Sequence, residues 1–445
     1  MNTALIFKLL AQRKKLLSRH TWSRQKIKRY QRSRLHELRK FVYAHSDFYK
    51  EFHRGFYDKE LEELPVLTKS MVMEHFDSLV TDKNIRLQEL QKCISAQDTD
   101  LYRKKYRVTV TSGTSGTAGI FLADEDEWVH ILASYARSTA LGGIGPVMFK
   151  KTKMGMVSTA FPRHQSYLVG SSTQSPMFDT LRIDIADPLD EIVEKLNRYQ
   201  PDALVSYSSM VALLADRQSG GDLKINPKAV FTTAEILTPD MRNRIKEAWG
   251  REPFNQYTAT ETGGLGAECS HHHGMHLFDD QVIIEVVDEH DKPVPPGVTG
   301  AALLVTPLFS RTQPLIRYKL DDSIRISEKP CSCGINFPLI DEIQGRTEQI
   351  VYLTSRQGKR VAVHPVLFYD VMDRAGVKHW QVRIIKGEFI FSITEDKKED
   401  IERAVVQMMQ AALLRMDVEP PAITVRHVDE LARSSHKLML ISIDI

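Results

Sequence analysis

The β-branched segment Val108-Thr109-Val110 leads directly into the loop Thr111-Ser112-Gly113-Thr114-Ser115-Gly116-Thr117-Ala118-Gly119. The three glycines of the loop allow its backbone to approach a ligand closely, and the hydroxyl groups between them add hydrogen-bond donors. The loop lacks the Gly-Lys-Ser/Thr ending of a Walker phosphate-binding loop. A strand followed by such a loop indicates a nest for phosphate oxygens. Taken alone, the loop is equally compatible with a flexible turn.

The segments that follow the loop alternate between strand-like and helix-like patterns. We predict strands at 154–158, 203–207 and 229–233 and helices at 189–199, 210–217 and 239–249. This alternation is typical of α/β proteins with largely parallel strands. After Gly264, strand-like segments at 282–287, 301–306 and 324–326 indicate a smaller, more antiparallel sheet.

Length and pattern together predict two domains in the 445 residues. The expected fold class is α/β, with a large N-terminal domain over residues 1–347 that has parallel-rich sheets and a small antiparallel sheet. Residues 1–60 form a basic helical extension of that domain. Residues 348–445 alternate strands and helices in the manner of a small α+β domain.

The charge of the chain is close to balanced, but its distribution is not. Lys and Arg number 60 against 57 Asp and Glu, a net charge of +3. Between Arg13 and Lys40 there are 12 basic residues and one acidic residue, Glu37. We interpret this run as a solvated basic helix rather than a site for nucleic acid or anionic lipid. A nucleic-acid-associated protein remains the rival interpretation, although it leaves the glycine-rich loop unexplained.

Nothing in the sequence indicates a signal peptide or a membrane span. Four cysteines in 445 residues argue against a disulfide framework. We therefore expect a cytoplasmic protein without a nucleic-acid partner. The oligomeric state stays open, with a dimer among the options.

Further motifs follow the loop in a fixed order. They are Gln256-Tyr257-Thr258-Ala259-Thr260-Glu261-Thr262-Gly263-Gly264, Arg317-Tyr318-Lys319-Leu320-Asp321-Asp322, Gly345-Arg346-Thr347-Glu348-Gln349-Ile350 and Arg433-Ser434-Ser435-His436-Lys437. In order and spacing they resemble the adenylate-forming superfamily of acyl-CoA synthetases, adenylation domains and luciferases, over roughly residues 105–440. Cys269 with Gly274-Met275-His276, Pro314 to Tyr318, and Cys331-Ser332-Cys333-Gly334 look most like the phenylacetate–CoA ligase branch.

This resemblance implies an activity and a motion. The implied reaction is attack of a carboxylate on the α-phosphate of ATP with release of pyrophosphate, followed by transfer of the acyl group from acyl-AMP to an acceptor. The acceptor is left open between coenzyme A, a carrier-protein thiol and an amine or hydroxyl. The C-terminal domain is implied to be mobile and to rotate about a hinge near Glu348 between the two half-reactions.

The resemblance also assigns roles to individual residues. The phosphate loop would consist of Thr111, Ser112, Gly113, Thr114, Ser115 and Gly116. Thr260 and Glu261 would contact the α-phosphate and Mg²⁺, and Ala234, Glu235 and Tyr257 would border the adenine and acyl pocket. Asp322 would bind the ribose hydroxyls, Arg346 would reach the ribose or a phosphate, and Lys437 would bridge the carboxylate and the α-phosphate. Carboxylate oxygens are ligands that Mg²⁺ prefers.

Two departures from the family pattern leave an alternative open. Thr117 stands where the family loop often has a lysine, so the charge of the β- and γ-phosphates would fall on Mg²⁺ and on other cations. His436 stands where a glycine usually precedes the C-terminal lysine. The alternative is a catalytically degenerate adenylate-forming fold that acts as a nucleotide-binding or interaction protein.

The cysteines indicate a separate metal site. Cys331 and Cys333 are one residue apart, and Cys269 precedes a histidine-rich run. Thiolate and imidazole ligands of this kind form four-coordinate zinc sites. The resemblance supports a structural zinc at these positions, with His276 as the preferred fourth ligand and His272 as the next choice. The other interpretation is three thiols that bind nothing.

Overall fold

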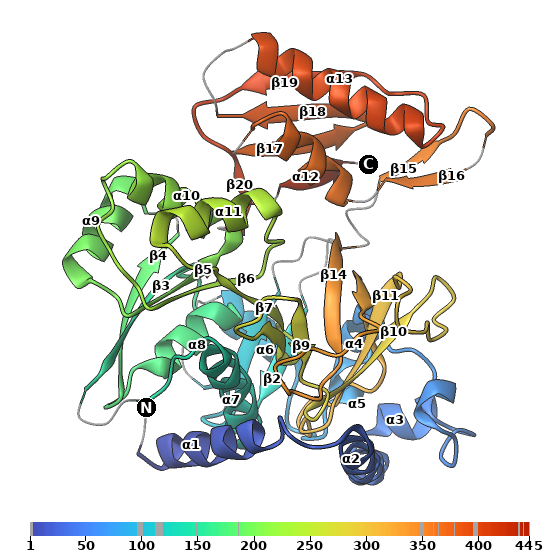
Figure 1. Cartoon of the computed structure of the whole chain (residues 1–445). Helices are drawn as coiled ribbons and strands as arrows, with labels where there is room; N and C mark the ends of the chain where they lie inside the picture. Colours follow the sequence, from blue (N-terminus) through green and yellow to red (C-terminus); the bar gives the residue numbers. More distant parts are fainter. Residues whose placement is uncertain are drawn as a thin grey trace. The chain divides into compact units, whose positions relative to one another are not determined.

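The computed structural model describes residues 3–95, 101–111, 119–146, 150–185, 187–346, 351–358, 360–363, 365–377, 379–394, 399–434, 437–438 and 440–444. The chain forms two compact units (Figure 1). The first comprises Met1–Leu320 and Ile324–Glu342, and the second comprises Asp321–Ser323 and Ile343–Ile445. The α/β fold class predicted from the sequence is confirmed.

The helical elements of the first unit are α1 (Thr3–Ser18), α2 (Arg24–His45), α3 (Asp47–Phe52), η1 (Leu61–Glu63), α4 (Lys69–Glu74), α5 (Phe76–Leu79), α6 (Leu87–Ser95), α7 (Glu125–Leu141), α8 (Gln165–Thr173), α9 (Leu189–Tyr199), α10 (Ser208–Ser219) and α11 (Pro239–Trp249). Its strands are β1 (Arg107–Val110), β2 (Ile120–Ala123), β3 (Thr152–Ser158), β4 (Phe178–Asp184), β5 (Ala203–Tyr207), β6 (Ala229–Thr233), β7 (Phe254–Ala259), β8 (Gly263–Glu268), β9 (Met275–Leu277), β10 (Val282–Val287), β11 (Ala302–Pro307) and β12 (Tyr318–Leu320). Two further strands are β13 (Asp322–Ile326) and β14 (Leu339–Arg346).

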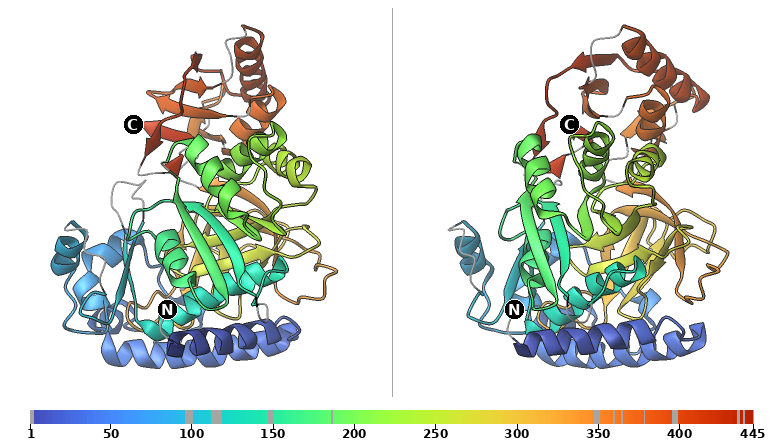
Figure 2. Two further views of the ribbon diagram at one scale, coloured as in Figure 1. Left: turned by 90° about the vertical axis from the view of Figure 1, so that its left-hand side faces the viewer. Right: turned by 60° about the vertical axis from the view of Figure 1, so that its left-hand side comes forward.

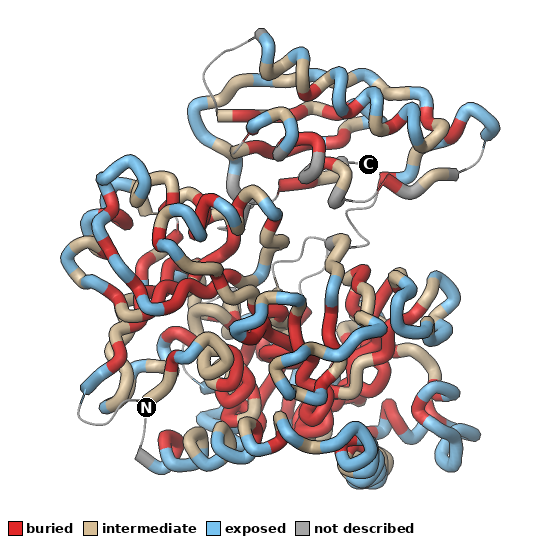
Figure 3. Tube along the Cα trace, in the orientation of Figure 1, coloured by how far each residue is buried: buried red, intermediate tan, exposed pale blue. Residues whose placement is uncertain are grey.

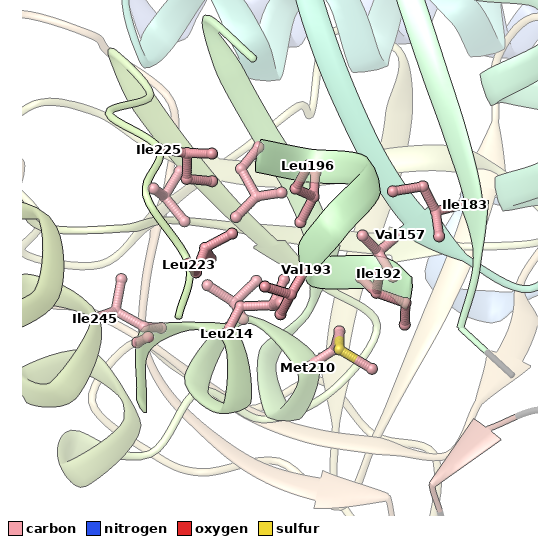
Figure 4. Packing of buried hydrophobic residues seen from close by; sticks show 14 of the residues in the cluster. Val157, Ile183, Ile192, Val193, Leu196, Met210, Leu214, Leu223, Ile225 and Ile245 are labelled. Carbon is pink, nitrogen blue, oxygen red and sulfur yellow. The ribbon is translucent and has the colours of Figure 1, made fainter. Parts of the chain in front are cut away.

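A nine-stranded sheet organises the first unit, in the order β13-β14-β9-β8-β7-β6-β5-β3-β4. Strands β4, β3, β5, β6 and β7 pair in parallel, and β7, β8, β9 and β14 pair antiparallel. Apolar residues of β3 to β6 and of helices α9 to α11 pack into one buried core, part of which is drawn in Figure 4. Burying such side chains is the main favourable term in folding, so this core holds β3 to β6 and helices α9 to α11 together.

The sequence explains why α11 lies where it does. Thr238 caps the helix by accepting a hydrogen bond from the Met241 amide, and Pro239 occupies the first turn. Gly250 ends the helix in the left-handed conformation, at φ +66°. These are the preferred start and stop signals of a helix, so the bounds of α11 agree with the predicted range 239–249.

One strand assignment from the sequence is wrong. Strands β10, β11 and β12 form the small antiparallel sheet, but 324–326 does not belong to it. This segment is part of β13, which lies at the edge of the nine-stranded sheet next to β14. The alternation of apolar residues reveals a strand but not its partner, because pairing is set by distant parts of the chain.

The second unit contains β15 (Val351–Thr354), β16 (Arg360–Val363), α12 (Pro365–Arg374), β17 (Trp380–Ile385), β18 (Glu388–Ile393), α13 (Glu399–Arg415), β19 (Ile423–His427), β20 (Arg433–Ser434), β21 (Lys437–Leu438) and β22 (Ile441–Asp444). Its main sheet has the order β19-β18-β17-β22. Strands β17 and β18 pair antiparallel, and the two outer strands pair in parallel.

The basic N-terminal segment forms two helices, not one, and it is anchored in the core. Helices α1 and α2 run along the base of the first unit (Figures 1 and 2). Arg19, in the turn between them, is only 2% exposed and lies 3.1 Å from a buried carboxylate oxygen of Asp280. Arg137 of α7 binds the same carboxylate with contacts of 2.7 and 2.8 Å. Desolvation raises the pKa of Asp280, but the two guanidinium groups outweigh it and hold the pKa below its usual range.

The outward faces of α1 and α2 are largely exposed, whereas the inner strands and α7 are buried (Figure 3). None of the described helices is both long enough and apolar enough to cross a membrane.

Candidate active site and metal centre

The ends of the glycine-rich loop are held together by backbone geometry. Strands β1 and β2 pair antiparallel, with Val110 opposite Ile120. The Thr111 amide donates to the Gly119 carbonyl at 2.9 Å, and the Gly119 amide donates to the Thr111 hydroxyl at 2.8 Å. The loop therefore leaves and re-enters the fold at one narrow neck. The predicted phosphate ligands Ser112, Gly113, Thr114, Ser115 and Gly116 lie outside the described residues.

A lysine that the sequence reasoning did not select lies against this neck. A Cβ atom added to Gly119 would lie 3.3 Å from Cε of Lys69, so the lysine stem packs on the glycine. Lys69 is the first residue of α4, which Thr68 caps through the Met71 amide. Because Lys69 precedes Gly119 by 50 residues, no local pattern connects the two. The one signal was the missing loop lysine at Thr117, which calls for a cation from elsewhere.

The Thr260-Glu261 pair lies in the tight turn that joins β7 to β8. The turn closes with a hydrogen bond of 3.3 Å from the Thr262 amide to the Ala259 carbonyl. Gly263 has a φ of +80°, and a Cβ there would lie 3.1 Å from Ser134 and Ile131, so glycine suits both the conformation and the space. The Gln165 side chain donates to the Thr260 carbonyl at 3.0 Å. The turn is thus fixed from α7 and from α8.

Glu261 and Lys69 are linked through the segment around Tyr318. The Tyr318 hydroxyl donates to a carboxylate oxygen of Glu261 at 3.3 Å. Leu67, two residues before Lys69, pairs with this strand: its amide donates to the Arg317 carbonyl and its carbonyl accepts from the Lys319 amide. A small pocket beside the cluster is lined by Thr109, Phe121, Trp128, Thr260 and Glu261, among others. The fold thus brings the acid, the hydroxyls and the neck of the loop into one region of the first unit.

The predicted border of the adenine and acyl pocket lies at the ends of β6 and β7. Ala234 follows β6 with a φ of +64°, which is strained for a residue with a side chain. A Glu235 carboxylate oxygen accepts from the Ser209 amide at 2.9 Å, at the start of α10. The hydroxyls of Thr233 and Thr258 lie 3.2 Å apart between the two strands, and Tyr257 is buried. Strained backbone of this kind gathers at functional sites.

The structure places only in part the remaining residues to which the resemblance assigns a role at the nucleotide. Asp322 begins β13 and is half-buried. Arg346 ends β14 and Lys437 begins β21, but the side chains of both lie outside what the structure describes. The hinge expected near Glu348 also lies outside the described residues.

The predicted metal ligands come together. One ligand atom each from Cys269, His276, Cys331 and Cys333 lies within 4.8 Å of all the others. The Cys269 and Cys331 sulfurs are 3.8 Å apart, and the Cys333 sulfur is 3.2 Å from Nε2 of His276. A tetrahedral zinc would set sulfur ligands about 3.8 Å apart and sulfur and nitrogen about 3.5 Å apart. The donor set and its spacing therefore fit zinc.

The sequence offers two histidines, His276 and His272, as the fourth ligand, and their surroundings in the structure distinguish them. His272 lies 3.1 Å from a Glu268 carboxylate oxygen, away from the four-residue group. Burial lowers the pKa of His276 to about 4, so its imidazole is neutral, as a metal ligand must be. Burial raises the pKa of Cys269 to about 12, so this thiol would stay protonated without a cation.

Comparisons with known proteins show what the chain is similar to. No family model matches the chain. Among solved structures, 2-hydroxyisobutyryl-CoA ligase in the postadenylation state with 2-HIB-AMP superposes with a TM-score of 0.74 at 19% identity, covering 96% of this chain and 91% of that one. ATP-bound MatB from Rhodopseudomonas palustris has a TM-score of 0.53 at 15% identity, over 75% and 66% of the two chains. The chain therefore shares its fold with 2-hydroxyisobutyryl-CoA ligase over nearly its whole length.

Two relatives found by sequence cover most of the chain. Phenylacetate-coenzyme A ligase of Thermus thermophilus is 23% identical over 398 residues, which is 85% of this chain and 82% of that protein. Protein CapK of Staphylococcus aureus is 24% identical over 342 residues, 74% and 69% of the two chains. The resemblance to the phenylacetate–CoA ligase branch, predicted from the motifs, is confirmed.

Proposed function

We propose that this chain is an AMP-forming acid–thiol ligase. It activates a carboxylic acid with ATP to an acyl-AMP, releases pyrophosphate and transfers the acyl group to a thiol, with coenzyme A as the first candidate. The observation that carries the proposal is the gathering of Glu261, Tyr318 and Lys69 beside the neck of the glycine-rich loop. The relatives named as coenzyme A ligases support it, as do neighbouring structures that contain an acyl-AMP and CoA.

The chemistry needs positioning and charge neutralisation more than a nucleophilic side chain. Thr260 and Glu261 would hold Mg²⁺, which neutralises phosphate charge when bound. Tyr318 keeps the Glu261 carboxylate oriented through its hydroxyl, and the Gln165–Thr260 hydrogen bond fixes the turn. Ala234, Glu235 and Tyr257 would border the adenine and the acid, and Asp322 and Arg346 would hold the ribose.

Lys69 would supply the cation that the loop lacks at Thr117. Its stem packs on Gly119, where the loop re-enters the fold, so its ammonium group can reach phosphates held by the loop. A lysine acts on phosphate as a compact point charge, and it need not come from the loop itself.

Lys69→Ala should raise the KM for ATP about tenfold to a hundredfold, as expected for loss of one charge-assisted hydrogen bond. Lys69→Arg should retain part of the affinity. Lys92→Ala, an exposed lysine of α6, is the matched control and should behave as wild type. In the Lys69→Ala background, Thr117→Lys should restore ATP binding. An unchanged KM for ATP in Lys69→Ala would remove this residue from the site.

ATP–pyrophosphate exchange tests the proposed function directly. The purified chain should show exchange with at least one member of a panel of aryl, fatty and amino acids. Pyrophosphate release in the presence and absence of coenzyme A would then identify the acceptor. No exchange with any acid, combined with binding of ATP, would instead favour the degenerate nucleotide-binding alternative.

We also propose that Cys269, His276, Cys331 and Cys333 hold a structural zinc. The cluster ties the β8–β9 region to the segment before β14. The turn that contains Glu261 lies directly before β8. Such a site stabilises the fold by linking distant segments, with no open position for substrate.

Metal analysis should therefore find about one zinc per chain. The double variant Cys331→Ser/Cys333→Ser should lose the metal and melt at a lower temperature, because two of the four bonds to the ion are removed. Cys93→Ser, a thiol outside the cluster, is the control and should keep both metal and stability. Metal-free protein with unchanged stability would reject the site.

A further inference from the structure

The charge of the first unit is strongly segregated. Residues 3–45 contain thirteen Lys and Arg residues and one acidic residue, a net charge of +12. Because the whole chain carries +3, the rest carries −9. Helices α1 and α2, which contain all of these basic residues except the buried Arg19, lie along the base of the unit (Figure 2).

We define the basic face of these helices by exposed Lys and Arg residues that form no ion pair in the described part of the chain. They are Lys14, Lys15, Lys28, Arg29, Arg32 and Lys40, all exposed. None of these six forms an ion pair with another residue in the described part of the chain. Other charges nearby are already paired: Lys8 with Glu125 and Asp126, Arg24 with Asp279, and Arg34 with Glu37.

An apolar stripe lies beside the basic face. The stripe consists of Phe7 and Ala11, which are four residues apart and share one side of α1 with Lys14, and all three residues are exposed. Phe7 is 68% exposed, the highest value among the described exposed large hydrophobic residues. Leu5, Ile6 and Leu16 on the opposite side are buried. Helix α1 thus has an inner apolar face that is buried in the fold. On its outer side, the apolar side chain of Phe7 is exposed.

In place of the solvated basic helix expected from the sequence, we propose that α1 and α2 form a docking surface for an anionic phospholipid bilayer. Basic side chains attract the negatively charged surface of such a bilayer, and an exposed Phe on an adjacent helix can enter its interfacial region. Two straight helices on one side of the unit suit a flat partner. Duplex nucleic acid would use the charge but leave the apolar stripe exposed, so the bilayer accounts for more of what is observed.

Vesicle flotation of the full chain tests this proposal. The chain should float with vesicles of phosphatidylcholine that contain phosphatidylglycerol and not with pure phosphatidylcholine, and salt should weaken the binding. Lys28→Glu/Arg29→Glu/Arg32→Glu should lower the partition at least about a hundredfold, since each basic residue near such a surface contributes about fivefold. Phe7→Ser should lower it about tenfold.

A matched control separates this face from total charge. Lys224→Glu/Lys292→Glu/Lys329→Glu makes the same change in charge at exposed positions outside α1 and α2, and it should float as wild type does. Both triple variants should keep the wild-type melting temperature and pyrophosphate release.

Several outcomes would overturn the proposal. They are equal binding to neutral vesicles, no binding to anionic ones, equal losses in the two triple variants, or binding of duplex DNA or RNA through this face without vesicle binding. Undiminished flotation of Phe7→Ser would reject insertion of the apolar stripe.

Discussion

Replacing Glu261 with Gln should lower acyl-AMP formation by at least about a hundredfold, comparable with removal of one oxyanion donor. The amide keeps the shape of the side chain but removes the charge that would hold Mg²⁺. The loss should appear in kcat more than in stability, because a metal ligand at the reacting phosphate acts in the transition state. Thr260→Ala should change activity in the same direction.

The measurement is pyrophosphate release at saturating ATP, together with the melting temperature of each variant. Glu289→Gln, at an exposed glutamate away from the turn, should retain wild-type rates. Tyr318→Phe tests orientation of the carboxylate and should cost less than Glu261→Gln, because it removes one contact of 3.3 Å and leaves the charge in place. Near-wild-type pyrophosphate release from Glu261→Gln would refute the metal assignment.

Lys437→Ala should abolish acyl-AMP synthesis but leave transfer from a supplied acyl-AMP nearly intact. The resemblance implies that this lysine bridges the carboxylate and the α-phosphate only during adenylation, and that the C-terminal domain then rotates to admit the acceptor. Lys437 pairs with Ser434 between the short strands β21 and β20, so its backbone has a defined place in the second unit.

The two half-reactions should be measured separately for this variant, with Lys386→Ala as the control at an exposed lysine of the same unit. If both half-reactions fall equally in Lys437→Ala, the residue is structural. If both are retained, the chain uses another cation for adenylation, and Lys69 would then be tested in the same assay.

Several elements could be predicted to the residue because their signals are local. Strands β5, β6 and β10 and helices α9 and α11 have the predicted bounds. Each is bounded by turn residues and, for α11, by a cap and a left-handed glycine. The meeting of Cys269, Cys331, Cys333 and His276 could also be predicted, since thiols are rare in this chain and a set of Cys and His residues points to zinc.

What could not be predicted depends on contacts between distant segments. Strand β13 belongs to the nine-stranded sheet because it pairs with β14. The lysine that lies against the neck of the loop is Lys69, 50 residues away from Gly119. A basic run gives no sign that Arg19 is buried on Asp280. In each case the partner lies far along the chain, where propensity and periodicity carry no information.

The Arg19–Asp280–Arg137 cluster also sets an order of events during synthesis. Arg19 leaves the ribosome 261 residues before Asp280, which at about 5–20 residues per second is a delay of roughly 13 to 50 s. Until Asp280 is made, Arg19 and Arg137 lack the carboxylate that neutralises them, so the first segment made cannot be secured at this point before most of the first unit has been synthesised. Ribosome-bound chains arrested before Asp280 should accordingly be cleaved by protease within residues 3–45, whereas chains arrested well beyond it should be protected there.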